Sequence, residues 1–547
     1  MKSTSPEAIG TIAVDLTPVL SGGENGGAKV FVLELLRRLA ELFPATQFVL
    51  LTQAGSHEEL AALDRANVRR ILISPGSGAP AARASWGVLS SSFLPYFPRR
   101  LQSITRRTAS KFVALTRRMK TRGVLDGLNI DLLFCPFTAP TYAEETTPTV
   151  SVIYDLQFKA HPEFFTDDDV AHRDQSFLSA CNKSSLLTAI SDFSRDEAIQ
   201  YGRLDPDKIQ TVHLQISNDR LHHAKKDPTI LPRLQLDPGR YLIFPANFWK
   251  HKNHEMLLTA FAMARAGGLA EDIKLVCTGA GGARQQWLMR AAAQIGLERH
   301  VVFPGFLSSA EFLTLLSGSA GLIFPSLYEG FGLPVIEAMA IGVPVACSNI
   351  TSLPEVAEGA AILFDPRMPT EIAKAMVSLV HDEPLRQQLI KLGHARASEF
   401  SDSTVMARQY WEIFLQATAL KRSSFSGAYV DGWVGPRLKF RLEPAAHARQ
   451  LQLELHLPSW APSEKVKIKS FAPSGMLRED VLKRDNTMLI EIPVAPAGGR
   501  YEVRFVEFFV PRDSGLGEDQ RELAAQLLRC AMSGPDGEAV DFSVSKF

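Results

Sequence analysis

Residues 321–344 have the sequence GLIFPSLYEGFGLPVIEAMAIGVP. The apolar run at 321–324 is typical of a buried parallel strand, and a proline ends it. A loop with two glycines around Phe331 follows, and Pro334 stands where a helix favours proline, at its first residue. We therefore predict a strand, a glycine loop and a short helix that ends near Gly342.

This arrangement suits the binding of a polar ligand. In a strand, loop and helix unit, free backbone N–H groups and the positive end of the helix dipole point at one place. Glu329 in the loop and Glu337 in the first helical turn lie on either side of that place. Because a carboxylate would repel a phosphate, we expect both glutamates to hold sugar hydroxyls, as in the binding of a nucleotide sugar.

The two glutamates also belong to a longer pattern. The sequence E-G-F-G-L-P-x-x-E-A, from Glu329 to Ala338, resembles the Glu-x7-Glu signature of family-four retaining glycosyltransferases. The resemblance covers roughly residues 9–415. It implies an α/β fold of the GT-B class, in which two Rossmann-like domains face a cleft. The alternative is an ordinary turn whose first-turn glutamate only favours the helix dipole.

The composition is that of a globular protein. The chain has 547 residues with equal numbers of acidic and basic side chains, so its charge gives no general reason to expect nucleic-acid binding. The five cysteines lie far apart without metal-type spacing, from which we expect reduced thiols and a cytoplasmic location. We expect neither a signal peptide nor a membrane span, because no apolar run is long enough.

Residues 1–225 are predicted to form the first Rossmann-like domain, on the acceptor side. Strands at 9–14 and 48–52 alternate with a helix at 28–43, which is typical of a parallel sheet. The resemblance places the intervening glycine-rich loop near the acceptor and the donor phosphates, and a flexible surface loop is the alternative. The candidate residues of this loop are Gly22, Gly23, Gly26 and Gly27.

A second candidate position follows the strand predicted at 149–154. Ligands bind at the carboxyl ends of strands in open α/β sheets, so Tyr154 and Asp155 are site candidates. Family members often carry His-Asp here, with the histidine against the donor sugar. A phenol can hydrogen-bond a sugar hydroxyl, but its ordinary pKa near 10 prevents it from acting as a base at neutral pH. His161 is the alternative histidine, although a structural or surface role is commoner.

Residues 65–125 are predicted to be a basic insertion in the first domain. Between Asp64 and Asp126 there is no acidic residue, while arginine, lysine, aromatic and aliphatic residues are interleaved. Such a stretch suits a peripheral contact with the anionic inner face of a membrane, or a lipid-linked acceptor. RNA or a partner protein suits it less well, and a solvated helical hairpin is the alternative.

Residues 237–400 are predicted to form the second Rossmann-like domain, which binds the donor. The strand at 241–244 leads to a loop that resembles the family loop whose lysine reaches the donor diphosphate, here Lys252. A compact ammonium suits this role. Many relatives carry arginine where Asn247 stands, so part of the phosphate clamp is absent or comes from Lys250. A basic surface loop is the alternative.

Further contacts are implied by the resemblance. In relatives, the residues that match Gly305 and Phe306 face the nucleotide base through backbone groups. The donor-binding candidates are Glu337, Gly330, Phe331, Gly332, Leu333, Asn247, Lys250, Gly305 and Phe306, and the catalytic candidates are Glu329, Lys252 and Asp155.

The rest of the chain is predicted to be a closing helix at 401–422 and an antiparallel β-sandwich at 425–547. Runs of alternating polar and apolar residues between Pro and Gly turns are typical of a sandwich. Trp433 and Trp460 could stack on sugar rings, although tryptophans more often belong to a core.

These observations predict a retaining glycosyltransferase that moves a hexose from a nucleoside diphosphate sugar to a hydroxyl of a glycan or glycolipid in cell-surface polysaccharide synthesis. Lys252 would hold the diphosphate, Glu329 the donor sugar and Glu337 the ribose. No DxD-like cation site lies in the right place, so neither a metal nor another cofactor is expected. The resemblance, through the Trp-Lys-His-Lys-Asn-His form of the loop at 249–254, implies GDP-mannose as donor. The alternatives are a GT-B sugar-nucleotide epimerase and a non-catalytic carbohydrate-binding protein.

Overall fold

The computed structural model describes residues 9–20, 26–73, 124–125, 128–144, 147–216, 226–420, 424–429, 431–442, 447–533 and 539–541. They form two compact units, one with two parallel sheets and one with an antiparallel sheet. Gly22, Gly23 and residues 74–123 of the predicted basic insertion lie outside the described residues.

The first parallel sheet has seven strands. They are β1 (Thr11–Asp15), β2 (Gln47–Thr52), β3 (Val68–Leu72), β4 (Leu132–Cys135), β5 (Thr149–Ile153), β6 (Leu186–Ala189) and β7 (Ile209–Thr211). Their spatial order is β3-β2-β1-β4-β5-β6-β7, with parallel ladders in the pairs β1–β2, β2–β3, β4–β5, β5–β6 and β6–β7. The order reverses between β1 and β4, as in doubly wound α/β folds.

Five α-helices within the described residues accompany this sheet. They are α1 (Gly26–Leu42), α2 (Ala54–His57), α5 (Gln157–Ala160), α6 (Asp167–Lys183) and α7 (Asp192–Gly202). In α1, Phe31, Leu35 and Leu39 recur at helical spacing and are buried. Ser191 begins α7, because its side-chain oxygen accepts a hydrogen bond from the backbone N–H of Ser194.

The second parallel sheet has six strands, all in parallel ladders. They are β8 (Tyr241–Pro245), β9 (Lys274–Thr278), β10 (Val301–Gly305), β11 (Gly321–Phe324), β12 (Val345–Ser348) and β13 (Ala361–Phe364). Their order is β10-β9-β8-β11-β12-β13, so this sheet reverses between β8 and β11. Ligands bind at such reversal points, outside the carboxyl ends of the strands.

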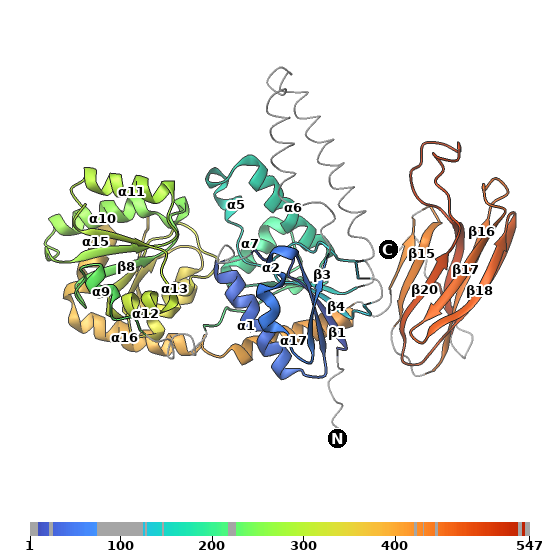
Figure 1. The fold of residues 1–547 in the computed structure, drawn as a ribbon, viewed down its shortest axis with the longest axis horizontal. Helices are drawn as coiled ribbons and strands as arrows, with labels where there is room; N and C mark the ends of the chain where they lie inside the picture. Colours follow the sequence, from blue (N-terminus) through green and yellow to red (C-terminus); the bar gives the residue numbers. More distant parts are fainter. Residues whose placement is uncertain are drawn as a thin grey trace, which may run out of the picture. The chain divides into compact units, whose positions relative to one another are not determined.

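Helices lie on both faces of the second sheet (Figure 1). They are α9 (Ile230–Arg233), α10 (His254–Ala266), α11 (Ala283–Gln294), α12 (Ser309–Gly318), α13 (Leu333–Ala340), α14 (Leu353–Ala357), α15 (Pro369–His381) and α16 (Glu383–Ser398). The predicted strand, loop and helix at 321–342 are confirmed as β11, its loop and α13. The helix begins one residue earlier than predicted, so Pro334 is its second residue rather than its first.

Helix α17 (Ser403–Leu420) returns to the first sheet. The indole of Trp411 stacks on Phe43 with ring centroids 3.8 Å apart, and the fully buried Tyr410 packs against Phe134 of β4. The hydroxyls of Tyr410 and Thr188 lie 3.2 Å apart. Within the described residues, no helix is both long enough and apolar enough to cross a bilayer.

Within the residues that the structure describes, the antiparallel unit contains nine strands. They are β14 (Ser424–Ala428), β15 (Trp433–Leu442), β16 (Arg449–Leu457), β17 (Lys465–Ala472), β18 (Gly475–Lys483), β19 (Asn486–Val494), β20 (Gly499–Phe505), β21 (Ala525–Ser533) and β22 (Ala539–Asp541). Seven follow the order β18-β17-β20-β15-β21-β16-β19, while β14 pairs with β15 and β22 with β21. Residues 123–132 and 142–148 also belong to this unit, and Arg441 Nη1 donates to the carbonyl oxygen of Asp131 at 2.9 Å.

The predicted antiparallel domain is confirmed, but its form differs from two separate stacked sheets. All nine strands belong to one hydrogen-bonded sheet, and β18 approaches β16 and β19, so the sheet is nearly closed. The alternating pattern buries every second residue of β16, among them Leu453 and Leu455. The curled sheet therefore surrounds its own core (Figure 1).

Candidate functional site

Two loops follow β8 and β11, the strands between which the second sheet reverses its order. The loop after β8 carries Lys252, and the loop after β11 carries Glu329. Asn253 ties the loops together: its backbone is left-handed (φ 63°), and its Nδ2 donates to the carbonyl oxygens of Pro325 at 3.0 Å and Pro366 at 2.8 Å. Two catalytic candidates thus lie at the expected binding edge of the sheet.

Lys252 and Glu329 form an ion pair there. Lys252 Nζ lies 2.5 Å from Glu329 Oε1, and the two side chains are only 14% and 12% exposed. The ammonium also lies 5.5 Å from the ring centroid of Phe324. Because both charges are largely removed from water, each depends on the other for compensation.

The glycine loop is shaped by close backbone contacts. Gly332 precedes α13 with φ of 109°, a conformation that side chains disfavour. Ser352 Oγ donates at 3.0 Å to the carbonyl oxygens of both Glu329 and Phe331. A Cβ atom at Gly330 would lie 2.3 Å from the carbonyl oxygen of Tyr154, so only glycine allows this approach.

We expect Gly330→Ala to lower stability by about 1–3 kcal/mol, because the added methyl group must push two backbones apart. Sugar transfer should fall as well, because Glu329 is the preceding residue. Urea unfolding and a transfer assay would measure both effects. Gly55→Ala is the matched control, since a Cβ at Gly55 meets nothing within 4 Å. Equal behaviour of the two variants would contradict the expectation.

Tyr154 and Asp155 differ in their surroundings. The Tyr154 ring packs edge-on against Phe31 with centroids 6.1 Å apart, and its buried hydroxyl has no hydrogen-bond partner among the described residues. Burial raises the pKa of the Asp155 carboxyl, against the lowering effects of the Gln157 backbone N–H and of Arg173. The charges of Glu329 and Lys252 have smaller effects, Glu329 raising this pKa and Lys252 lowering it. Of these two side chains, Asp155 is therefore the one whose pKa depends on the charges of Lys252 and Glu329.

Tyr328 joins the glycine loop to the segment that carries Asp155. Its hydroxyl accepts a hydrogen bond from the backbone N–H of Leu156 at 3.1 Å and donates to the carboxylate of Glu197 in α7. Burial raises the pKa of Glu197. The phenol itself is 3% exposed, so this contact is interior.

The start of α7 also contacts the glycine loop. Ser191 Oγ donates to the carbonyl oxygen of Gly330 at 2.6 Å, and Ser194 Oγ donates to the same oxygen at 3.2 Å and to that of Tyr154 at 3.0 Å. One carbonyl of the second α/β half is thus held by two hydroxyls of the first.

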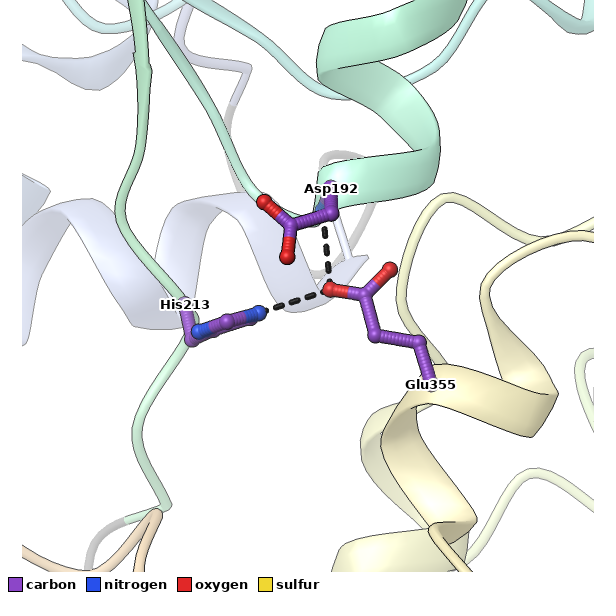
Figure 2. Close-up of side chains that lie close together, drawn as sticks. All are labelled: Asp192, His213 and Glu355. Carbon is purple, nitrogen blue, oxygen red and sulfur yellow. Dashed lines mark hydrogen bonds and ion pairs between the residues drawn. The ribbon is translucent and has the colours of Figure 1, made fainter.

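A carboxylate from α14 caps the same helix (Figure 2). Glu355 accepts hydrogen bonds from the backbone N–H groups of Asp192 at 2.8 Å and Phe193 at 3.0 Å, and from His213 Nε2 at 2.7 Å. Burial raises the pKa of Glu355, but these hydrogen bonds outweigh it, and the net pKa is lowered. We call this arrangement the Glu355 cap.

Asp192, His213 and Glu355 could each offer one ligand atom to a metal, all within 4.8 Å of one another. The contacts favour the cap over a cation. Both Glu355 oxygens face N–H groups at the positive end of a helix, and Arg195 lies 3.1 Å from Asp192. A cation there would meet like charge.

The other candidates lie in two places. Phe331 is buried with its ring 6.1 Å from that of His213, and Leu333 lies against Gly27. Glu337 is half-buried in the second turn of α13 rather than in the first turn as predicted, because the helix begins at Leu333. These residues surround the glycine loop.

The second place is near the carboxyl ends of β9 and β10. Asn247 Oδ1 accepts from the N–H of Ala280 at 2.9 Å, and the carbonyl oxygen of Gly305 accepts from Gly279. Phe306 is 78% exposed, and Lys250 is exposed too. Gly26 and Gly27 were predicted to lie in the glycine-rich loop, but they are the first two residues of helix α1, where Gly26 has φ of 53°.

Comparison with known proteins identifies the second α/β half. Residues 229–396 match the family model described as "Glycosyl transferases group 1". The chain carries a group 1 glycosyltransferase domain.

Named relatives align with about half of this chain. O-antigen chain mannosyltransferase B of Escherichia coli is 29% identical over 253 residues, 46% of this chain and 66% of the relative. The serotype-specific mannosyltransferase WbdA of Escherichia coli is 26% identical over 258 residues, 46% of this chain and 32% of the relative. The chain therefore spans less than two thirds of either protein.

A solved structure shows the same fold. HepE of Anabaena, crystallised with UDP and glucose, superposes with a TM-score of 0.53 over 74% of this chain and 99% of its own length, at 16% identity. With the two parallel sheets of reversed strand order, this likeness confirms the predicted GT-B fold class.

The sequence alone missed four residues that connect the glycosyltransferase domain to the first α/β half: Glu197, His213, Tyr328 and Glu355. Their partners lie 131 to 172 positions away in the chain, so no local spacing marks them. Glu355 has the clearest signal, a carboxylate in a Leu-Pro-Glu turn at a helix start.

Proposed function

We propose that this protein is a retaining glycosyltransferase that moves a hexose from a nucleoside diphosphate sugar to a hydroxyl of a glycan or glycolipid. The observation that carries the proposal is the Lys252–Glu329 ion pair at the reversal point of the glycosyltransferase domain. The names of the two Escherichia coli relatives support a role in polysaccharide synthesis.

Each candidate has a role that its surroundings support. Lys252 would exchange its contact with Glu329 for the diphosphate and stabilise the charge that develops on the leaving group. Glu329, released from the lysine, would accept hydrogen bonds from donor-sugar hydroxyls. Asp155, whose pKa is raised by burial, lies near both groups and would contact the sugar or the acceptor hydroxyl. Glu337 would hold the ribose.

The proposal needs no metal or other cofactor, because a lysine and a helix N-terminus can together balance the diphosphate. We propose GDP-mannose as the donor, in line with the names of the mannosyltransferase relatives. HepE was crystallised with UDP and glucose, so uridine nucleotides belong in the same test. The anomeric configuration of the product, read by NMR, would test the retaining course of the reaction.

Donor binding is the first experiment. Saturation-transfer NMR with GDP-mannose, UDP-glucose and UDP-N-acetylglucosamine should show one donor bound. Glu337→Ala should weaken its binding about tenfold, since two charge-assisted hydrogen bonds to the ribose are lost. Glu298→Ala, at an exposed position of the same domain, is the control.

The outcome also separates the alternatives. Binding of no donor would contradict the proposal and leave a non-catalytic carbohydrate-binding protein. Consumption of the donor without any glycan acceptor would favour an epimerase. A peripheral membrane contact through 65–125 stays a prediction, because most of that segment lies outside the described residues.

A further inference from the structure

One end of the antiparallel sheet gathers loops from distant parts of the unit. Trp433 at the start of β15 pairs with Gln526 at the start of β21, which in turn pairs with His456 at the end of β16. The loop after β16 and the loop before β21 therefore emerge at the same end of their strands. The start of β15 lies beside this end, and the turn before β15 runs back along β21, where the Gly432 carbonyl oxygen accepts from the Leu527 N–H. Loops that share one end of a β-domain are common binding surfaces.

An exposed tryptophan stands on this end. Trp460, in the loop after β16, is 48% exposed, whereas Trp433 and Phe509 beneath it are each 7% exposed. Its ring centroid lies 5.4 Å from that of Trp433 and 6.2 Å from that of Phe509, and those two rings are 5.8 Å apart. Two core aromatics thus fix the orientation of the indole while leaving about half of it exposed.

A polar cluster is attached to the same aromatic group. Arg521 donates to both oxygens of Asp431, at 3.0 and 2.6 Å, and to Asp519 at 2.7 Å. Its guanidinium lies 4.7 Å from the ring centroid of Tyr429. The Tyr429 N–H donates to the carbonyl oxygen of Trp433 at 2.7 Å, so the cluster is held against the strand that supports Trp460. Asp431, Asp519 and Arg521 remain 47%, 31% and 35% exposed.

We propose that this end of the sheet is a binding site for a neutral hexose oligosaccharide. The apolar face of a pyranose ring would stack on Trp460, and its hydroxyls would hydrogen-bond Asp431, Arg521 and Asp519. Carboxylates and a guanidinium held in one ion-pair network offer acceptors and donors in a fixed geometry, which suits neighbouring hydroxyls.

Charge argues against other ligands. Two carboxylates surround one guanidinium, so a phosphate or a nucleic acid would meet net negative charge. An apolar partner would leave the polar cluster desolvated without new hydrogen bonds. A sugar chain offers an apolar ring face that stacks on the indole and hydroxyls that hydrogen-bond the polar groups.

The proposal deepens the proposed function in one respect and rests on it there: the oligosaccharide bound would be of the class that the enzyme elongates. The binding site itself lies in the antiparallel unit and uses none of the donor-site residues. Its failure can therefore be distinguished from failure of the transferase proposal.

The test is isothermal titration of the full chain with α-mannan oligosaccharides, maltoheptaose and isomaltoheptaose. We expect one of these to bind, and Trp460→Ala to weaken its binding about tenfold or more. Trp460→Phe should restore part of the affinity, and Asp431→Asn should weaken it. Trp287→Ala is the matched control, because Trp287 is 43% exposed on α11 of the other unit.

Two further measurements keep the test decisive. An unchanged thermal transition of Trp460→Ala would show that the unit stays folded, and donor binding by NMR should be unchanged in that variant. Absence of binding by all three oligosaccharides, or equal binding by wild type and Trp460→Ala, would overturn the site. Loss of glycan binding in Trp460→Ala would support it even if no nucleotide sugar were bound.

Discussion

Replacement of Lys252 by alanine is expected to lower kcat for sugar transfer by about 10²- to 10³-fold, because the developing charge on the leaving diphosphate loses its ammonium partner. The same change leaves the carboxylate of Glu329 largely buried without its counter-charge. We therefore also expect a loss of stability of about 1–3 kcal/mol. Steady-state kinetics and urea unfolding measure the two effects separately.

A double variant separates chemistry from stability. In Lys252→Ala/Glu329→Gln no uncompensated charge remains, so most of the lost stability should return while transfer stays low. Lys374→Ala, an exposed lysine on α15, controls for the loss of a positive charge in the same domain. Recovery of activity in the double variant would show that Lys252 acts only by neutralising Glu329.

Replacement of Glu355 by alanine is expected to lower the free energy of unfolding at pH 7 by about 1–3 kcal/mol, because the N–H groups of Asp192 and Phe193 and the ring of His213 lose their acceptor. The ordinary pKa of 4.5 is lowered in the folded chain. The carboxylate therefore stabilises the fold above pH 4.5, and this contribution disappears as the pH falls through the lowered pKa.

The measurement is urea unfolding of wild type and Glu355→Ala at several pH values between 7 and 3. The difference between them should shrink towards the acid end. Glu358→Ala is the control, because Glu358 lies in the same turn, is 69% exposed and caps no helix of the first α/β half. A difference that does not depend on pH, or one equal to that of the control, would argue against the Glu355 cap.

Most strands of the two parallel sheets could be predicted because they are short apolar runs. Strand β3 (Val68–Leu72) was missed, because it lies at the start of the stretch 65–125 that was predicted to be a basic insertion, whereas it pairs with β2 in the first sheet. The predicted strand at 321–324 matches β11 residue for residue, and the one at 48–52 differs from β2 by one residue. The strands of the antiparallel sheet were harder to predict from the sequence. Strand β18 carries Arg478, Glu479 and Asp480 and is mostly exposed, so no apolar alternation marks it. Strand β21 was also missed, although it lies between β15 and β16.

The site residues likewise divide into those that a local motif marks and those that depend on contacts between distant parts of the chain. Lys252 and Glu329 were found because each belongs to a motif, and the structure brings them to 2.5 Å. Tyr154 packs against Phe31 rather than beside Glu329. This contact depends on the direction of one side chain at the end of a strand. The contacts of α7 with Gly330 and Glu355 depend on how two halves of the chain meet, which local sequence does not encode.

The place of β21 in the sheet bears on how the protein is made. Strands β14 to β20 leave the ribosome before β21, yet β21 pairs with both β15 and β16. Until residue 533 has emerged from the ribosome, the edges of β15 and β16 that pair with β21 lack these backbone partners. Residues 123–132 and 142–148 are likewise synthesised before the rest of the unit to which they belong. Synthesis of the second α/β half is thus complete well before the antiparallel unit, or the segments near β4 that belong to it, can close.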